Sequence, residues 1–118
     1  MKRIAIFASG SGTNTQAIIE YFGNKNNIEI ALVLSNKKSA YVLERAKKYG
    51  IEAATFSKND LNNSMRIIEI LKEKQIDLIV LAGFLLLIPE SLIRHFPRKI
   101  INIHPALLPK YGGKVCME

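Results

Sequence analysis

The sequence contains little cysteine, no tryptophan and no long apolar run. Cys116 is the one cysteine among 118 residues, which excludes an internal disulfide and a site built from several cysteines. Aromatic residues make up 8%, so no platform for stacking nucleic-acid bases is expected. The longest apolar run, Leu78 to Pro89, is shorter than the roughly 18 residues that a membrane helix needs. We therefore expect no membrane association.

Acidic residues are also few, at 10 against 17 basic residues, and the net charge is +7. Such an excess can indicate nucleic-acid binding, but the basic residues are scattered in runs of no more than two. We interpret them as a solvated surface that favours anionic small substrates, and expect no nucleic-acid partner. The basic N-terminus is followed by an apolar run too short for a signal peptide, which predicts a cytoplasmic protein.

Short β-branched runs alternate with segments of helical periodicity. Strands are expected at Ile4–Ala8, Ile28–Leu34, Ala53–Phe56, Leu78–Ala82 and Ile100–His104. Helices are expected at Ala17–Phe22, Tyr41–Tyr49, Ser64–Lys74 and, with a proline in its first turn, Pro89–His95. This alternation predicts an α/β fold: a three-layer, Rossmann-like, mostly parallel sheet with strand order 3-2-1-4-5 over residues 1–118. Ligands of such sheets bind at the carboxyl ends of the strands.

A glycine-rich loop follows the first expected strand, with the sequence Gly10-Ser11-Gly12-Thr13-Asn14. Glycines let the backbone approach an oxyanion, and the start of the next helix offers free N–H groups. Ser11, Thr13 and Asn14 add side-chain donors, so the loop is a candidate phosphate site. The alternative is a tight turn in which Ser, Thr or Asn caps the helix.

Two better-known phosphate motifs are excluded. The dinucleotide fingerprint needs a glycine where Thr15 stands, and an acid after the second strand, where Ser35-Asn36-Lys37-Lys38 stands. The Walker loop needs Gly-Lys-Ser/Thr, which is absent from the sequence. A phosphate on a small molecule therefore fits better than NAD or ATP.

A second motif, Asn102-Ile103-His104-Pro105, lies at the end of the last expected strand. Side chains alternate across a strand, so Asn102 and His104 point to one side. The amide can donate to a developing oxyanion, and the imidazole can donate or move a proton. The alternative is a histidine that merely caps the strand. No acid or second histidine accompanies the pair, so we expect no metal site.

Three segments together resemble the phosphoribosylglycinamide formyltransferase family of purine synthesis. They are Ser9–Asn14, Leu81–Phe84 and Asn102–Tyr111, in the order and spacing of that family. The resemblance implies that this chain is the N-terminal half of a formyltransferase fold. It also implies transfer of a formyl group from the co-substrate 10-formyltetrahydrofolate to the amine of glycinamide ribonucleotide, without a metal.

The resemblance assigns roles by position. Ser11, Gly12, Thr13 and Asn14 would hold the substrate phosphate, and the catalytic residues would be Asn102 and His104. The folate would be bound by Leu85, Leu86, Leu87, Ile88, Ile93 and Asn102. Leu86 stands where the family often has arginine, and core packing is the alternative for this apolar stretch. Alternatives for the whole chain are methionyl-tRNA formyltransferase, formyltetrahydrofolate deformylase, or a non-catalytic phosphate-binding or oligomerising module.

Family members are longer than this chain, so the resemblance predicts a C-terminal truncation that removes a catalytic aspartate and impairs turnover. Residues 115–118 form an aberrant tail, Val115-Cys116-Met117-Glu118. Deleting one G from GGT-ATG-TAT-GGA-A, which encodes Gly-Met-Tyr-Gly, produces a frame that encodes this tail. We therefore expect a frameshift, which resequencing the locus tests. A sheet cut after its fifth strand would expose an edge, which predicts a homo-oligomer formed through the truncated sheet.

Overall fold

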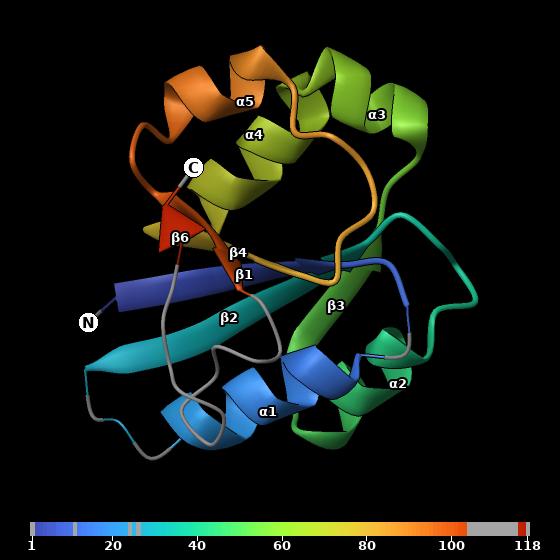
Figure 1. Ribbon diagram of the computed structural model, residues 1–118, viewed down its shortest axis with the longest axis vertical. Helices are drawn as coiled ribbons and strands as arrows, with labels where there is room; N and C mark the ends of the chain where they lie inside the picture. The colour runs from blue at the N-terminus through green and yellow to red at the C-terminus, as the bar shows by residue number, and fades with distance from the viewer. Residues whose placement is uncertain (1, 11, 24, 26, 104–115, 118) are drawn as a thin grey trace.

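The computed structural model describes residues 2–10, 12–23, 25, 27–103 and 116–117. Six strands form one sheet, with helices on both of its faces (Figure 1). The strands are β1 (Lys2–Ala8), β2 (Ile28–Ser35), β3 (Glu52–Thr55), β4 (Leu78–Ala82), β5 (Ile100–Ile103) and β6 (Cys116–Met117). The helices are α1 (Thr13–Phe22), α2 (Tyr41–Lys48), α3 (Lys58–Asn63), α4 (Met65–Glu73) and α5 (Glu90–His95).

The strand order is β3-β2-β1-β4-β5-β6, which confirms the predicted order of the first five strands. These five strands are parallel, and β1 lies at the centre, paired with β2 on one side and β4 on the other. The order therefore reverses between β1 and β4, which is where parallel α/β sheets bind ligands. The short strand β6 pairs antiparallel to β5 and was not predicted.

Both faces of the sheet are buried, as the near-continuous apolar runs of its strands require. On one face, Phe7, Leu34 and Ile79 pack with the apolar sides of α3, α4 and α5. On the other face, Ile6, Val33, Val80 and Ile103 pack with α1 and α2. No helix in the described part of the chain combines the length and apolar character needed to cross a bilayer.

Two details differ from the sequence-based expectations. The helix α3 was missed, and it begins with a capping box in which Ser57 and Asp60 each accept a hydrogen bond from the other's backbone N–H, both at 3.0 Å. Pro89 is the N-cap of α5 in an extended conformation, so it precedes the first turn that we expected it to occupy.

Candidate functional site at the carboxyl edge of the sheet

The predicted motifs follow three neighbouring strands. The glycine-rich loop follows β1, the segment from Gly83 to Pro89 follows β4, and Asn102 lies near the end of β5. Because the three strands are parallel and adjacent, these segments leave the sheet along one edge (Figure 1). His104, Pro105 and Ser11 lie outside the described residues, as do residues 115 and 118 of the tail.

The start of α1 offers backbone N–H groups to an anion. Gly12 is the N-cap, and no side chain makes a cap hydrogen bond in the described structure. The N-cap position is therefore held by a glycine and not by a serine, threonine or asparagine. No acidic residue lies in the first turn of α1, so nothing there offsets the positive end of the helix dipole. This arrangement matches the requirement for binding a phosphate.

The backbone conformation and the packing of the loop both require a glycine at position 12. Its φ is 84°, in the left-handed region, and a Cβ there would lie 2.6 Å from Cγ2 of Val42 in α2. Gly10, by contrast, has no atom within 4 Å of a Cβ placed on it. The loop is therefore pressed against α2 at Gly12 and open at Gly10.

Asn14 brings the first motif next to the segment that follows β4. Its Nδ2 lies 3.7 Å from the position that a Cβ on Gly83 would take. Gly83 itself has a φ of 67°. Thr13 is exposed and Asn14 is half-buried, so both side chains lie near solvent at the point where the strand order reverses.

Side chains of the segment after β4 point alternately into the core and into solvent. Phe84 packs against Phe7 and Phe56, with ring centroids 5.5 and 5.9 Å apart, and Leu86 and Ile88 also contact this core. The intervening Leu85 and Leu87 are 73% and 92% exposed, and Ile93 in α5 is 38% exposed. Core packing thus accounts for Leu86 and Ile88, whereas Leu85, Leu87 and Ile93 present apolar surface to solvent.

Asn102 is an exposed residue of β5, opposite Leu81 of β4. Its neighbour Ile103 belongs to the core on the α1 and α2 face, and Ile100 belongs to the core on the opposite face. By alternation, the Asn102 side chain lies on the same face as Ile100 and Phe84. The other histidine, His95, is exposed in α5 with its Nδ1 2.8 Å from the Ser91 carbonyl oxygen.

Ser9 is a residue of this edge that the sequence did not single out for a role. It is fully buried, and its Oγ donates to Oδ1 of Asn36 at 2.6 Å and accepts from the N–H of Leu85 at 3.0 Å. The hydroxyl thereby joins the segments that follow β1, β2 and β4. The signal that could have found it is a hydroxyl directly after a buried strand, where it must find partners within the protein.

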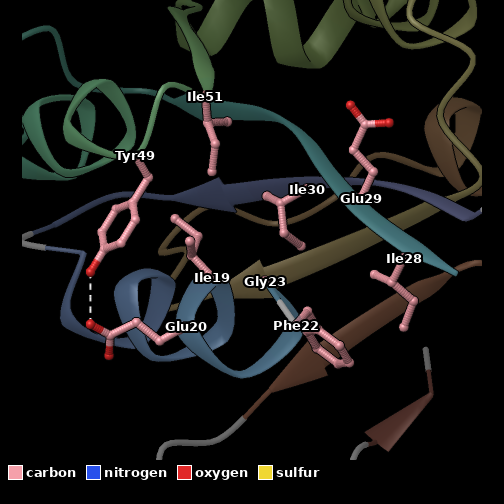
Figure 2. Close-up of a pocket in the computed structure, with 9 residues that line it drawn as sticks. All are labelled: Ile19, Glu20, Phe22, Gly23, Ile28, Glu29, Ile30, Tyr49 and Ile51. Carbon is pink, nitrogen blue, oxygen red and sulfur yellow. Dashed lines mark hydrogen bonds between the residues drawn. The ribbon is translucent and has the colours of Figure 1, made fainter. Parts of the chain in front are cut away.

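A cavity of about 430 Å³ lies at the other end of the molecule, beside the last turn of α1 and the first residues of β2 (Figure 2). Its lining residues are Ile19, Glu20, Phe22, Gly23, Ile28, Glu29, Ile30, Tyr49 and Ile51. Within it the Tyr49 hydroxyl donates to Glu20 at 2.7 Å, which raises the pKa of that tyrosine. None of the predicted site residues lines this cavity, and its carboxylates suit an anion poorly.

The described residues contain no cluster of three or more histidine, cysteine, aspartate or glutamate side chains able to hold a metal. The described residues of the carboxyl edge offer N–H donors, amides, hydroxyls and apolar surface. Together the fold and this edge define an α/β protein in which a helix that begins at a glycine, with no acid in its first turn, starts at the reversal point of the sheet.

Comparisons with known proteins agree with that class and narrow it. A sequence model described as "Formyl transferase" matches residues 2–118. The chain belongs to the formyl transferase family. It is 42% identical to phosphoribosylglycinamide formyltransferase of Haemophilus influenzae, over 96% of this chain and 56% of that protein. It is 39% identical to the Bacillus subtilis protein of the same name, over 96% of this chain and 60% of that protein.

Solved structures show the same likeness. Glycinamide ribonucleotide transformylase 1 from Geobacillus kaustophilus superposes with a TM-score of 0.82 at 42% identity, covering 97% of this chain and 63% of that one. Phosphoribosylglycinamide formyltransferase from Anaplasma phagocytophilum superposes with a TM-score of 0.80 at 36% identity, covering 94% and 53%. The chain thus matches less than two thirds of the length of these relatives.

Proposed function

We propose that the protein containing these residues transfers a formyl group from 10-formyltetrahydrofolate to the amine of glycinamide ribonucleotide. The observation that carries the proposal is the start of α1, where Gly12 is the N-cap and the first turn holds no acid, beside the segment after β4. The names of the similar proteins point to the same reaction.

The substrate phosphate binds at the start of α1. The backbone N–H groups of Gly12, Thr13 and Asn14 supply donors, with Ser11 beside them, and the helix dipole favours the anion by about 0.3–1 kcal/mol. The Asn14 amide, next to Gly83, adds a side-chain donor on the side of β4. The net charge of +7 favours the approach of an anionic substrate.

Asn102 and His104 carry the chemistry. The substrate amine attacks the formyl carbon, a new C–N bond forms, and the formyl oxygen becomes an oxyanion that the Asn102 amide stabilises by donating a hydrogen bond. The bond from that carbon to the folate nitrogen then breaks, and the proton lost by the amine passes to the folate nitrogen. His104 holds and moves that proton, since an imidazole can both accept and donate one near neutral pH.

The co-substrate lies against the apolar segment after β4. Leu85, Leu87 and Ile93 are exposed and offer walls for a flat heterocycle, while Leu86 and Ile88 pack beneath them in the core. Asn102 lies on the same face of the sheet and reaches the formyl group from β5. No metal takes part in this scheme.

A formyl-transfer assay tests the proposal with two proteins. One is the 118-residue chain, and the other is the chain continued beyond Lys114 with the C-terminal part of the Haemophilus influenzae relative. We expect slow or absent turnover by the chain alone and clear transfer by the extended protein. A folded extended protein that binds glycinamide ribonucleotide but transfers nothing would contradict the proposal and favour a non-catalytic phosphate-binding module.

The choice of acceptor separates the related reactions. We expect the formyl group to reach glycinamide ribonucleotide, and neither methionyl-tRNA nor water. Transfer to methionyl-tRNA would indicate a methionyl-tRNA formyltransferase, and release of formate a formyltetrahydrofolate deformylase. The matched control is His104→Ala in the extended protein, which should keep phosphate binding and lose transfer.

A further inference from the structure

The Ser9 hydroxyl connects the two segments that the proposed reaction uses. Ser9 directly precedes the glycine-rich loop, and its two hydrogen bonds reach Asn36 after β2 and Leu85 after β4. The Leu85 N–H can only donate, so Ser9 accepts from it and its own proton goes to Oδ1 of Asn36. This buried hydroxyl therefore donates one hydrogen bond and accepts another.

Leu85 is held at its backbone while its side chain stays free. Its N–H bonds to Ser9, and the preceding Phe84 packs on Phe7 and Phe56. The Leu85 side chain is nevertheless 73% exposed. The hydrogen bond to Ser9 therefore fixes the backbone position of Leu85, whose apolar side chain lies in solvent and does not contribute to the core.

We propose that Ser9 is a positioning residue, whose hydroxyl holds the segment after β4 in register with the phosphate-binding loop after β1. The inference rests on the proposed function, which places the phosphate on one segment and the folate on the other. It follows that binding of a phosphate ligand at the start of α1 stabilises the hydrogen bond of the Leu85 N–H to Ser9. The ligand does so without contacting Leu85.

Ser35 supplies a matched control. It is also a fully buried serine at the carboxyl end of a strand, and it pairs in the sheet with Ala8, the residue before Ser9. Among the described residues, its Oγ accepts one local hydrogen bond, from the N–H of Lys37 at 3.2 Å. Ser35→Ala thus removes the same group from a similar place without touching the segment after β4.

The experiment measures amide hydrogen exchange at Leu85 by NMR and affinity for glycinamide ribonucleotide by calorimetry, both on the 118-residue chain. In Ser9→Ala we expect Leu85 to exchange about tenfold faster or more, because a local bond that limits opening is gone. We expect affinity to fall about fivefold, the lower end of measured coupling between sites. The ligand should slow exchange at Leu85 in the unchanged chain and in Ser35→Ala, but not in Ser9→Ala.

A second variant covers the case in which Ser9→Ala fails to fold. Asn36→Ala removes the acceptor of the Ser9 proton at a half-buried position, and it should also speed exchange at Leu85. If Ser9→Ala leaves both the exchange rate at Leu85 and its response to the ligand unchanged, the inference is overturned and the proposed function stands. The same result in Asn36→Ala decides the question if only that variant folds. Absence of ligand binding by both the unchanged chain and the extended protein would instead overturn the proposed function, and the inference with it.

Discussion

Val42 packs so closely on Gly12 that a Cβ at Gly12 would lie 2.7 Å from the Val42 Cα. The contact joins the loop before α1 to the first turn of α2, where the N–H of Val42 also bonds to the Gly10 carbonyl at 3.4 Å. Backbone atoms cannot move aside as the end of a flexible side chain can. The shape of the loop that we propose to bind phosphate therefore depends on α2 as well as on its own sequence.

Gly12→Ala should destabilise the chain strongly, and Gly10→Ala should not. The left-handed φ of Gly12 costs another residue about 1–2 kcal/mol, and overlap with Val42 adds about 1–3 kcal/mol. No atom lies within 4 Å of a Cβ at Gly10, so Gly10→Ala should change the free energy of unfolding by less than about 0.5 kcal/mol. Urea denaturation of both variants measures the difference, and equal stabilities would refute this reading of the loop.

Asn102→Ala should lower formyl transfer without lowering stability. The side chain is exposed, so its loss should change the free energy of unfolding by less than about 0.5 kcal/mol. Loss of an oxyanion donor should lower kcat by about 10²–10³ in the extended protein described above. Asn62→Ala, an exposed asparagine of α3, is the control and should leave kcat unchanged. Similar rates for the two variants would remove Asn102 from the chemistry.

Gln75→Gly should stabilise the chain. The helices α2 and α4 end with the same backbone conformation, but the left-handed position holds a glycine after α2 and a glutamine after α4. In each, the second residue past the cap bonds back at 2.9 Å, Ile51 to the Ala46 carbonyl and Ile76 to the Leu71 carbonyl. The residue between is left-handed in both helices, Gly50 with φ 71° and Gln75 with φ 56°.

We expect Gln75→Gly to raise the free energy of unfolding by about 0.5 kcal/mol. Removing the strain of a left-handed glutamine outweighs the added conformational entropy of the unfolded chain. Gly50→Ala should cost about 1–2 kcal/mol through backbone strain alone, because no atom lies within 4 Å of its Cβ position. Urea denaturation decides both, and a destabilising Gln75→Gly would contradict the argument.

Acid should loosen the start of α3. The Asp60 carboxylate accepts a hydrogen bond from the backbone N–H of Ser57, which lowers the pKa of Asp60 below the ordinary value for aspartate. The stabilisation is therefore complete above the pKa of an unfolded aspartate and is lost as the pH falls through the lowered value. NMR titration of the Ser57 amide should report this low pKa, and Asp60→Asn should abolish the titration. A midpoint at or above the ordinary value would contradict the capping box.

Most of the fold could be predicted because strands that are buried on both faces consist of consecutive apolar residues, such as Leu78–Ala82. The helix α3 could not be found by periodicity, since Lys58–Asn63 contains one apolar residue, Leu61. Only the Ser57 and Asp60 pair marks its start. The strand β6 has two residues, too few for any pattern.

The candidate site was predicted in part, for a physical reason. Gly12, Thr13, Asn14 and Asn102 stand in local motifs at strand ends, and the structure places these strand ends along one edge. The role of Ser9 depends on partners 27 and 76 residues away in sequence. Such contacts follow only from the order of the strands. Similarly, alternation alone could not decide which of Leu85 to Ile88 face the core, because all four are apolar.

Binding of the substrate phosphate at the start of α1 is tested most directly by NMR titration of the 118-residue chain with glycinamide ribonucleotide and, in parallel, with its dephosphorylated riboside. We predict that the ribonucleotide shifts the amides of Gly12, Thr13 and Asn14 most strongly, and that the riboside does not. Equal responses to both compounds, or shifts centred on the cavity beside Ile19 and Tyr49, would contradict the assignment of this site.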